Sequence, residues 1–249
     1  MFTDGLQTVF NKIDRDFTAL ICGKRQSGKD TLIRYIYGII NQRFRNVIIF
    51  DNVGSLNMLG KKSYDITREN LQIAMAFCKE QARAKAPLHN TLIILNDFYQ
   101  YNDCRREIDE LFMCSRNYRT SVLVSCSYLN FPPLVRANTD LYFQFYEHQQ
   151  SIIDRVYKYF GAYNTDTNRF NNIVRSLKPG ECFLVNFIHR SHLPAEHLAK
   201  IPQIDTVPHD ELYNLYRQPV VKHDISKIEL VSKINAIINS LVDLRNSLK

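Results

Sequence analysis

Short apolar runs alternate along the chain with longer segments in which apolar residues recur every three or four positions. The short runs predict strands at Phe17–Cys22, Val47–Asp51, Thr91–Leu95, Ser121–Cys126, Leu141–Phe145 and Cys182–Ile188. The longer segments predict helices at about 29–42, 67–84, 104–117, 148–160, 167–176 and 208–217. Because the apolar runs lack strict alternation, we expect their strands to be buried on both faces. The pattern therefore predicts an α/β fold in which helices cover both faces of a mainly parallel sheet.

The length of 249 residues suits one sizeable domain with a terminal appendage. We expect the domain to span residues 1–201, followed at 202–249 by a connection and a C-terminal amphipathic helix. In that last segment Ser226 and Glu229 form a capping-box start, after which apolar residues recur at three- and four-residue steps. This apolar stripe either packs back on the same domain or joins subunits of an oligomer.

The composition is that of a globular protein, with 45% hydrophobic and 23% charged residues. No apolar run approaches the roughly 18 residues of a membrane-spanning helix, so we expect no membrane span. Residues 1–5 have neither the basic nor the apolar region of a signal peptide, so we expect the chain to stay inside the cell. The six cysteines form no C-x-x-C pair, which favours reduced thiols over disulfides or a zinc site.

The charge balance favours a polyanionic partner. The formal net charge is +7 and the pI is near 9.0, and a basic surface gains affinity for nucleic acid by releasing counterions from the phosphates. Many basic proteins bind no nucleic acid, so the charge gains meaning only together with a motif.

The strongest local signal is a G-x-x-x-x-G-K pattern between the first predicted strand and the first predicted helix. Two glycines at this spacing let successive backbone N–H groups face a phosphate, and the start of the next helix adds the positive end of its dipole. The lysine then reaches the β- and γ-phosphates of ATP. The alternative is an ordinary Gly-rich turn. The nucleotide-binding residues predicted from the pattern are Gly23, Lys24, Arg25, Gln26, Ser27, Gly28, Lys29, Asp30 and Thr31, of which Lys29 is also catalytic.

This loop departs from the usual pattern at Asp30, which stands where a serine or threonine hydroxyl normally holds Mg²⁺. Thr31 lies one residue too late for that role. A carboxylate beside a triphosphate is repulsive unless a cation lies between them. Asp30 therefore either contacts the metal ion or damages the site.

Two polar residues, Asn96 and Asp97, end the apolar run that begins at Thr91. This is the arrangement that brings a Walker B carboxylate beside a phosphate-binding loop. Buried strands also end in Asp or Asn for turn formation alone, so both interpretations stay open at this point.

Further motifs follow in a fixed order. Arg116 lies near a helix end, the next strand ends at Cys126, an S-Y-x-x-x-P turn begins at Ser127, and an R-A-N motif occupies 136–138. In this order and spacing, the motifs resemble those of the poxvirus-type DNA-packaging ATPases of large DNA viruses, a branch of the FtsK/HerA superfamily of P-loop NTPases. The resemblance covers roughly residues 15–190 and is tightest at 115–145.

The resemblance implies an ATPase that pumps double-stranded DNA and threads a viral genome into a preformed capsid. It implies a ring of subunits, expected to be a hexamer, with ATP and Mg²⁺ as cofactors. The implied partners are double-stranded DNA without sequence preference, other copies of the chain, and capsid proteins. The implied location is the host-cell cytoplasm or a viral factory, with association with the virion also open.

Site residues follow from matching positions. Gly23, Gly28 and Lys29 would bind the phosphates, and Asp97 would polarise the attacking water. Arg116 would be offered to a neighbouring subunit's nucleotide, where it would stabilise charge on the γ-phosphoryl oxygens; a solvated arginine at a helix end is the alternative. Arg136 and Asn138 match the R-A-N motif, and we assign them no firm role.

Three positions differ from the pattern of the family. The first Walker B acid is Asn96, the loop hydroxyl is Asp30, and the polar sensor, normally Gln, is Cys126. A thiol is a poor hydrogen-bond partner for water or phosphate. The first two changes form one hypothesis, an exchanged metal site of Asp30, Asn96 and Asp97, in which the acid and the neutral oxygen ligand have swapped places without changing the formal charge.

Two other functions stay open. The first is a nucleotide-binding structural or regulatory protein in which Asp30, Asn96 and Cys126 record lost catalysis. The second is a P-loop kinase that acts on a small molecule, which predicts an arginine-rich lid and no oligomer.

Overall fold

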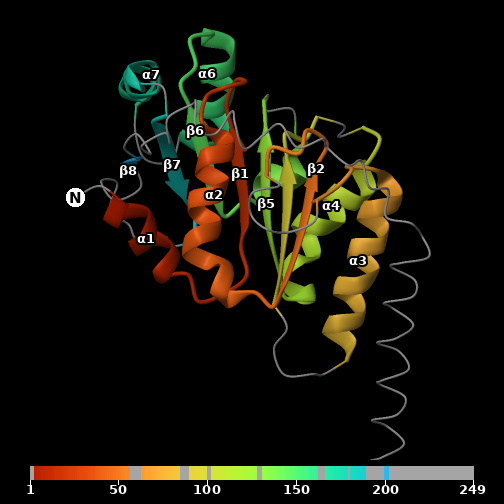
Figure 1. Ribbon diagram of the computed structural model, residues 1–249. Coiled ribbons are helices and arrows are strands. Elements are labelled where there is room, and N and C mark those ends of the chain that lie inside the picture. Colours follow the sequence, from red (N-terminus) through yellow and green to blue (C-terminus); the bar gives the residue numbers. More distant parts are fainter. Residues whose placement is uncertain are drawn as a thin grey trace, which may run out of the picture.

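The fold is a three-layer α/β arrangement in which helices pack on both faces of one sheet (Figure 1). The predicted fold class is therefore confirmed. The predicted helix at 208–217 and the predicted C-terminal unit at 202–249 lie outside the described residues. The computed structural model describes residues 3–56, 63–84, 90–99, 102–127, 131–161, 166–178, 180–188 and 199–201.

The described part of the sheet has eight strands in the order β3-β2-β4-β5-β1-β6-β7-β8. Each pair of neighbouring strands from β3 to β6 in this order is parallel. The pairs β6–β7 and β7–β8 are antiparallel. All six predicted strands are present, and β3 and β8 are additional. The strands are β1 (Thr18–Cys22), β2 (Asn46–Asp51), β3 (Ser63–Tyr64), β4 (Thr91–Asn96), β5 (Thr120–Cys126), β6 (Leu141–Phe145), β7 (Cys182–Asn186) and β8 (Ala199–Ile201).

Five of the six predicted helices lie in the described residues, and all five are present. The α1 and α5 helices are additional. Local capping fixes two helix starts: the Thr67 hydroxyl accepts from the Asn70 amide, and the Asp166 carboxylate accepts from the Arg169 amide. The helices are α1 (Thr3–Asn11), α2 (Lys29–Ile40), α3 (Arg68–Arg83), α4 (Arg105–Cys114), α5 (Pro133–Ala137), α6 (Gln150–Val156) and α7 (Thr167–Ser176), with short 3₁₀ or π segments at Asn41–Arg43, Ser115–Tyr118 and Tyr157–Gly161.

Alternating side chains of the central strands build two separate cores. Ala19 and Ile21 of β1 pack with α1 and α2, whereas Leu20 and Cys22 of the same strand pack on the opposite face with α3, α4, α6 and α7. Every residue of β1, β4, β5 and β6 is buried. Both faces of these strands are therefore closed to solvent. We call the edge where the parallel strands end the carboxyl edge and the edge where they begin the amino edge.

The described helices are all either too short or too polar to cross a bilayer.

Candidate nucleotide-binding site

The loop that joins β1 to α2 lies at the carboxyl edge and has the backbone shape that its glycines predict. Gly28, which precedes the first residue of α2, has a φ of 105°, and Gln26 has a φ of 61°. A Cβ atom at position 28 would also lie 3.2 Å from the Phe145 ring. The left-handed backbone and the nearby ring both favour glycine at this position.

Close packing rather than a dihedral angle explains the first glycine of the motif. A Cβ atom at Gly23 would lie 2.6 Å from the Ser27 hydroxyl oxygen and 2.7 Å from the Phe145 Cβ. The Gly23 amide donates to the carbonyl of Cys126 at 3.1 Å, which ties the loop to the end of β5. Any side chain at position 23 would therefore push the loop away from the sheet.

Lys29 is buried inside the loop. Its Nζ donates to the carbonyl oxygens of Gly23 at 2.8 Å and Lys24 at 2.9 Å. A buried ammonium must be paired, because desolvation of an unpaired charge is costly. Phosphate oxygens would be stronger, charged partners for the same donor than these neutral carbonyls.

Lys24 is anchored by a carboxylate that the sequence analysis missed. Its Nζ lies 3.2 Å from Glu147 Oε1 and 2.8 Å from His148 Nδ1. Burial alone would raise the pKa of the Glu147 carboxyl, but hydrogen bonds from the Gln149 and His148 amides and from Lys24 outweigh it and lower the pKa. Glu147 follows β6, so its proximity to the loop depends on the strand order β1-β6.

The loop also has polar groups that suit a bound phosphate and its cation. The buried Ser27 hydroxyl has no hydrogen-bond partner among the described residues. Asp30 lies in the first turn of α2 and is partly exposed. Its side chain makes no hydrogen bond or ion pair with any residue that the structure describes. These observations fit a triphosphate seated in the loop, with a cation between it and Asp30.

At the end of β4, serine hydroxyls hold both predicted Walker B positions. Asn96 is buried, and its side chain accepts from Ser125 Oγ at 2.6 Å and donates to Ser55 Oγ at 2.8 Å. Asp97 has a φ of 50°, and its carboxylate accepts from Ser127 Oγ at 3.1 Å. Ser55 and Ser125 are functional candidates that motif spacing did not reveal, because their contacts with Asn96 arise only when β2, β4 and β5 pair.

The predicted metal ligands Asp30, Asn96 and Asp97 all belong to the carboxyl edge. The described residues contain no cluster of three or more His, Cys, Asp or Glu side chains suited to a metal ion. Mg²⁺ commonly takes one or two carboxylates and completes its shell with phosphates and water. The residues present therefore fit a magnesium ion that binds together with a triphosphate.

Cys126 lies at the end of β5, beside the loop, and is fully buried. Its Sγ is 3.1 Å from Cys22 Sγ on the neighbouring strand. The hydrogen bond with Cys22 and burial raise the pKa of the Cys126 thiol well above its ordinary value, although Lys29 opposes the shift. The thiol therefore stays neutral, and the hydroxyl groups next to it in sequence are those of Ser125 and Ser127, which donate to Asn96 and Asp97.

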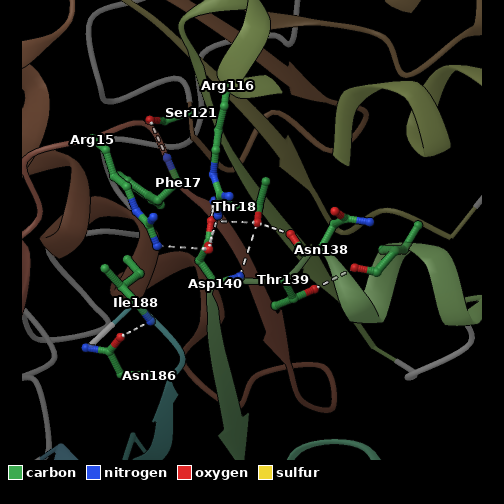
Figure 2. Close-up of polar contacts among 11 residues, drawn as sticks. Arg15, Phe17, Thr18, Arg116, Ser121, Asn138, Thr139, Asp140, Asn186 and Ile188 are labelled. Atoms are coloured by element: carbon green, nitrogen blue, oxygen red, sulfur yellow. Dashed lines mark hydrogen bonds and ion pairs between the residues drawn. The ribbon is translucent and has the colours of Figure 1, made fainter. Parts of the chain in front are cut away.

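Arg116 does not lie beside its own loop. It is part of the 3₁₀ turn Ser115–Tyr118 before β5, and its guanidinium pairs with Asp140 at the amino edge (Figure 2). The seven residues of β5, at about 3.3 Å each, separate it from the carboxyl edge by about 20 Å. Arg116 is thus the one predicted catalytic residue that the fold keeps apart from Lys29 and Asp97.

The R-A-N motif has local structural contacts. Arg136 donates to the Phe131 carbonyl and lies 3.5 Å from the centre of the Tyr159 ring. Asn138 ends α5, where its side chain donates to the Leu134 carbonyl at 2.8 Å. The Asn138 side chain therefore caps the end of α5.

Comparison with known proteins places this geometry on a known fold. No protein-family model matches the sequence, and no curated protein matches it. Among solved structures, the genome-packaging NTPase B204 of Sulfolobus turreted icosahedral virus 2, in complex with ATP-gammaS, is similar with a TM-score of 0.56 and 16% identity, over 77% of this chain and 100% of that chain. The cytoplasmic domain of the type VII secretion ATPase EccC from Thermomonospora curvata is similar with a TM-score of 0.53 and 14% identity, over 75% of this chain and 25% of that chain.

These similarities show that the chain shares its fold with a viral genome-packaging NTPase and with a type VII secretion ATPase. The DNA-packaging ATPase B204 from Sulfolobus Turreted Icosahedral Virus is also similar to this chain, with a TM-score of 0.56 and 17% identity over 77% of this chain and 100% of that chain. The family resemblance predicted from the motifs is therefore confirmed at the level of the fold.

Proposed function

We propose that this chain is an ATP-driven translocase of double-stranded DNA that packages a viral genome into a preformed capsid. One observation supports this most strongly: a loop with buried Lys29 and left-handed Gly28 lies on a fold shared with the viral packaging NTPase over that protein's whole length. We propose that the partners are double-stranded DNA, capsid proteins and other copies of the chain in a six-membered ring. The location that follows is the host-cell cytoplasm or viral factory, including association with the virion.

In this proposal the loop binds the triphosphate of ATP. Lys29 exchanges its two loop carbonyls for β- and γ-phosphate oxygens, and the Ser27 hydroxyl gains a partner. Asp97 orients the attacking water, and Ser127 holds the Asp97 carboxylate in place. Bound Mg²⁺, held by Asp30 and Asn96, would neutralise charge on the phosphate oxygens.

Arg116 acts in the proposal on the nucleotide of a neighbouring subunit. The strand length places it too far from the loop of its own chain, and its side chain is half exposed at the amino edge. Charge that spreads over the γ-phosphoryl oxygens in the transition state is stabilised by an arginine supplied in this way. A ring in which each amino edge meets the next carboxyl edge would make every site depend on two chains.

The proposal is tested by the rate of ATP hydrolysis with and without linear double-stranded DNA. We expect turnover that rises on addition of the duplex and that is lost in Lys29→Ala. The salt dependence of the DNA effect is a second readout, because phosphate contacts without sequence preference weaken as salt rises. Turnover that is measurable but indifferent to DNA would contradict the translocase function.

A nucleotide-binding regulatory protein is the second candidate. It is favoured by Asp30, Asn96 and Cys126, the three residues that differ from the catalytic pattern of the family. In that case the loop binds ATP, but Asp97 does not activate a water molecule and ATP is not hydrolysed. Tight ATP binding combined with no hydrolysis, with DNA present or absent, would select this candidate over the translocase.

A further inference from the structure

A compact charged cluster lies at the amino edge, far from the nucleotide loop. Asp140 lies directly before β6, Arg15 lies before β1, and Arg116 lies before β5. Figure 2 shows both guanidinium groups directed at the same carboxylate. Neither Arg15 nor Asp140 belongs to any motif in the sequence, and they meet only because β1 pairs with both β5 and β6.

The Asp140 carboxylate is held by the backbone on one side and by the arginines on the other. Its Oδ2 accepts from the Thr18 amide at 2.9 Å and from the Thr18 hydroxyl at 3.1 Å. Its Oδ1 faces Arg116 and, at 3.8 Å, Arg15. The Thr18 hydroxyl shares its one proton between Asp140 Oδ2 and the Asn138 carbonyl, which connects the cluster to the R-A-N motif. One oxygen is thus fixed in the sheet, while the other positions two cations.

Exposure differs sharply within the cluster. The Asp140 side chain is 8% exposed, whereas the Arg15 and Arg116 side chains are 46% and 52% exposed. Arg15, Arg116 and Asp140 by themselves carry a net charge of +1, and one carboxylate cannot occupy all the N–H donors of two half-exposed guanidinium groups. The Asp16 carboxyl also interacts with Arg116: burial raises the pKa of this carboxyl above its ordinary value, although Arg119, Ser121 and Arg116 oppose the shift.

We propose that Arg15 is a second arginine that, with Arg116, contacts the triphosphate bound by another copy of this chain, and that Asp140 is the positioning residue for both. The inference rests on the proposed function, because it needs a nucleotide at the neighbouring loop. It adds two residues to the site that neither the motifs nor the fold comparison assigns.

A triphosphate suits this pair of arginines better than a protein carboxylate does. The transition state of phosphoryl transfer spreads negative charge over three oxygens, and two planar guanidinium groups can bind several of them at once. Fixing both groups in advance lowers the entropy cost of forming that contact. Asp140 supplies this fixation before the second copy arrives.

The experiment compares Arg15→Ala, Arg116→Ala and Asp140→Asn with the parent. Asparagine can keep an oxygen acceptor for Thr18 while it directs its NH₂ group at the arginines, so it releases them with little change in shape. Arg83→Ala is the matched control, since Arg83 is an exposed arginine paired with a carboxylate, Glu80, at 2.9 Å on α3. Circular dichroism melting checks that each variant folds.

We expect kcat to fall about a hundredfold in Arg15→Ala and in Asp140→Asn, and roughly a thousandfold in Arg116→Ala. The KM for ATP and equilibrium ATP binding should stay as in the parent, and Arg83→Ala should keep parental turnover. Adding an excess of Lys29→Ala subunits, which keep the cluster but cannot hydrolyse ATP, should restore turnover to each of the three variants.

The outcomes separate the inference from the function on which it rests. If Lys29→Ala subunits rescue Arg116→Ala but not Arg15→Ala or Asp140→Asn, the proposed function survives and this inference is wrong. Parental turnover in Arg15→Ala, or weaker ATP binding in Asp140→Asn, would also overturn it. A parent protein without ATP turnover would contradict the proposed function and the inference together.

Discussion

Asp30 and Asn96 carry the most unusual chemistry of the site, because an acid stands where the motif expects a hydroxyl and an amide where it expects an acid. Asn96 is buried between the Ser125 and Ser55 hydroxyls, whereas Asp30 is partly exposed and makes no bond within the described residues. The structure places both residues at the carboxyl edge. Their exchange as metal ligands stays a prediction.

That exchange predicts non-additive kinetics. Asp30→Thr and Asn96→Asp should each lower ATP turnover by roughly tenfold or more, because each alone changes the charge around Mg²⁺. The double variant restores the charge balance and should recover much of the lost rate. Steady-state ATPase assays over a Mg²⁺ titration check this, and a single Asp30→Thr variant faster than the parent would contradict the exchange.

Ser127 supports a separate prediction at the same scale. Its hydroxyl donates to Asp97 Oδ1, so Ser127→Ala should leave Asp97 less well oriented and lower kcat roughly tenfold. ATP binding should be unchanged, since Ser127 lies outside the loop. A lower ATP affinity with an unchanged kcat, measured by titration and initial rates, would show that Ser127 does not act through Asp97.

Motif spacing could predict Gly23, Gly28 and Lys29, because their roles depend on local backbone geometry. It could not predict Glu147, which reaches Lys24 across a strand pair more than a hundred residues apart in sequence. Contacts between neighbouring strands are set by strand order, which a single sequence does not specify.

At the scale of elements, the junction of β1 and α2 depends on one left-handed residue. Gly28→Ala should lower the free energy of unfolding by about 1–3 kcal/mol, because alanine is strained at a φ of 105° and its Cβ would lie 3.2 Å from the Phe145 ring. Gly38→Ala, inside the same helix with open space around a Cβ, should instead stabilise by roughly 0.5–1 kcal/mol. Urea unfolding of both variants checks the pair, and a neutral Gly28→Ala would contradict the described loop shape.

The contact between the loop and the end of β6 predicts a pH dependence. Glu147 has a lowered pKa in the folded protein, so its contribution to stability is present above its unfolded value of 4.5 and is lost as pH falls through the folded value. Glu147→Gln should therefore show a shallower fall in unfolding free energy below about pH 4.5 than the parent. Denaturant unfolding at several pH values measures this, and parallel curves for the two proteins would refute it.

Over the whole molecule, the apolar pattern predicted the layers because strands buried on both faces have short apolar runs without strict alternation, as in β1 and β4. The β3 and β8 strands have only two and three residues, too few to form a periodic pattern. The position of Arg116 at the edge opposite the loop also needed the fold, since sequence order alone does not tell which end of the sheet a residue occupies.

The account depends most on a triphosphate in the loop between β1 and α2. Isothermal titration of the protein with a non-hydrolysable ATP analogue at millimolar Mg²⁺ measures this directly, with Lys29→Ala as the comparison. We expect saturable binding of one nucleotide per chain, weakened roughly tenfold to a hundredfold in Lys29→Ala, because a buried charge-assisted contact is lost. No binding to the parent, or equal binding to both proteins, would contradict it.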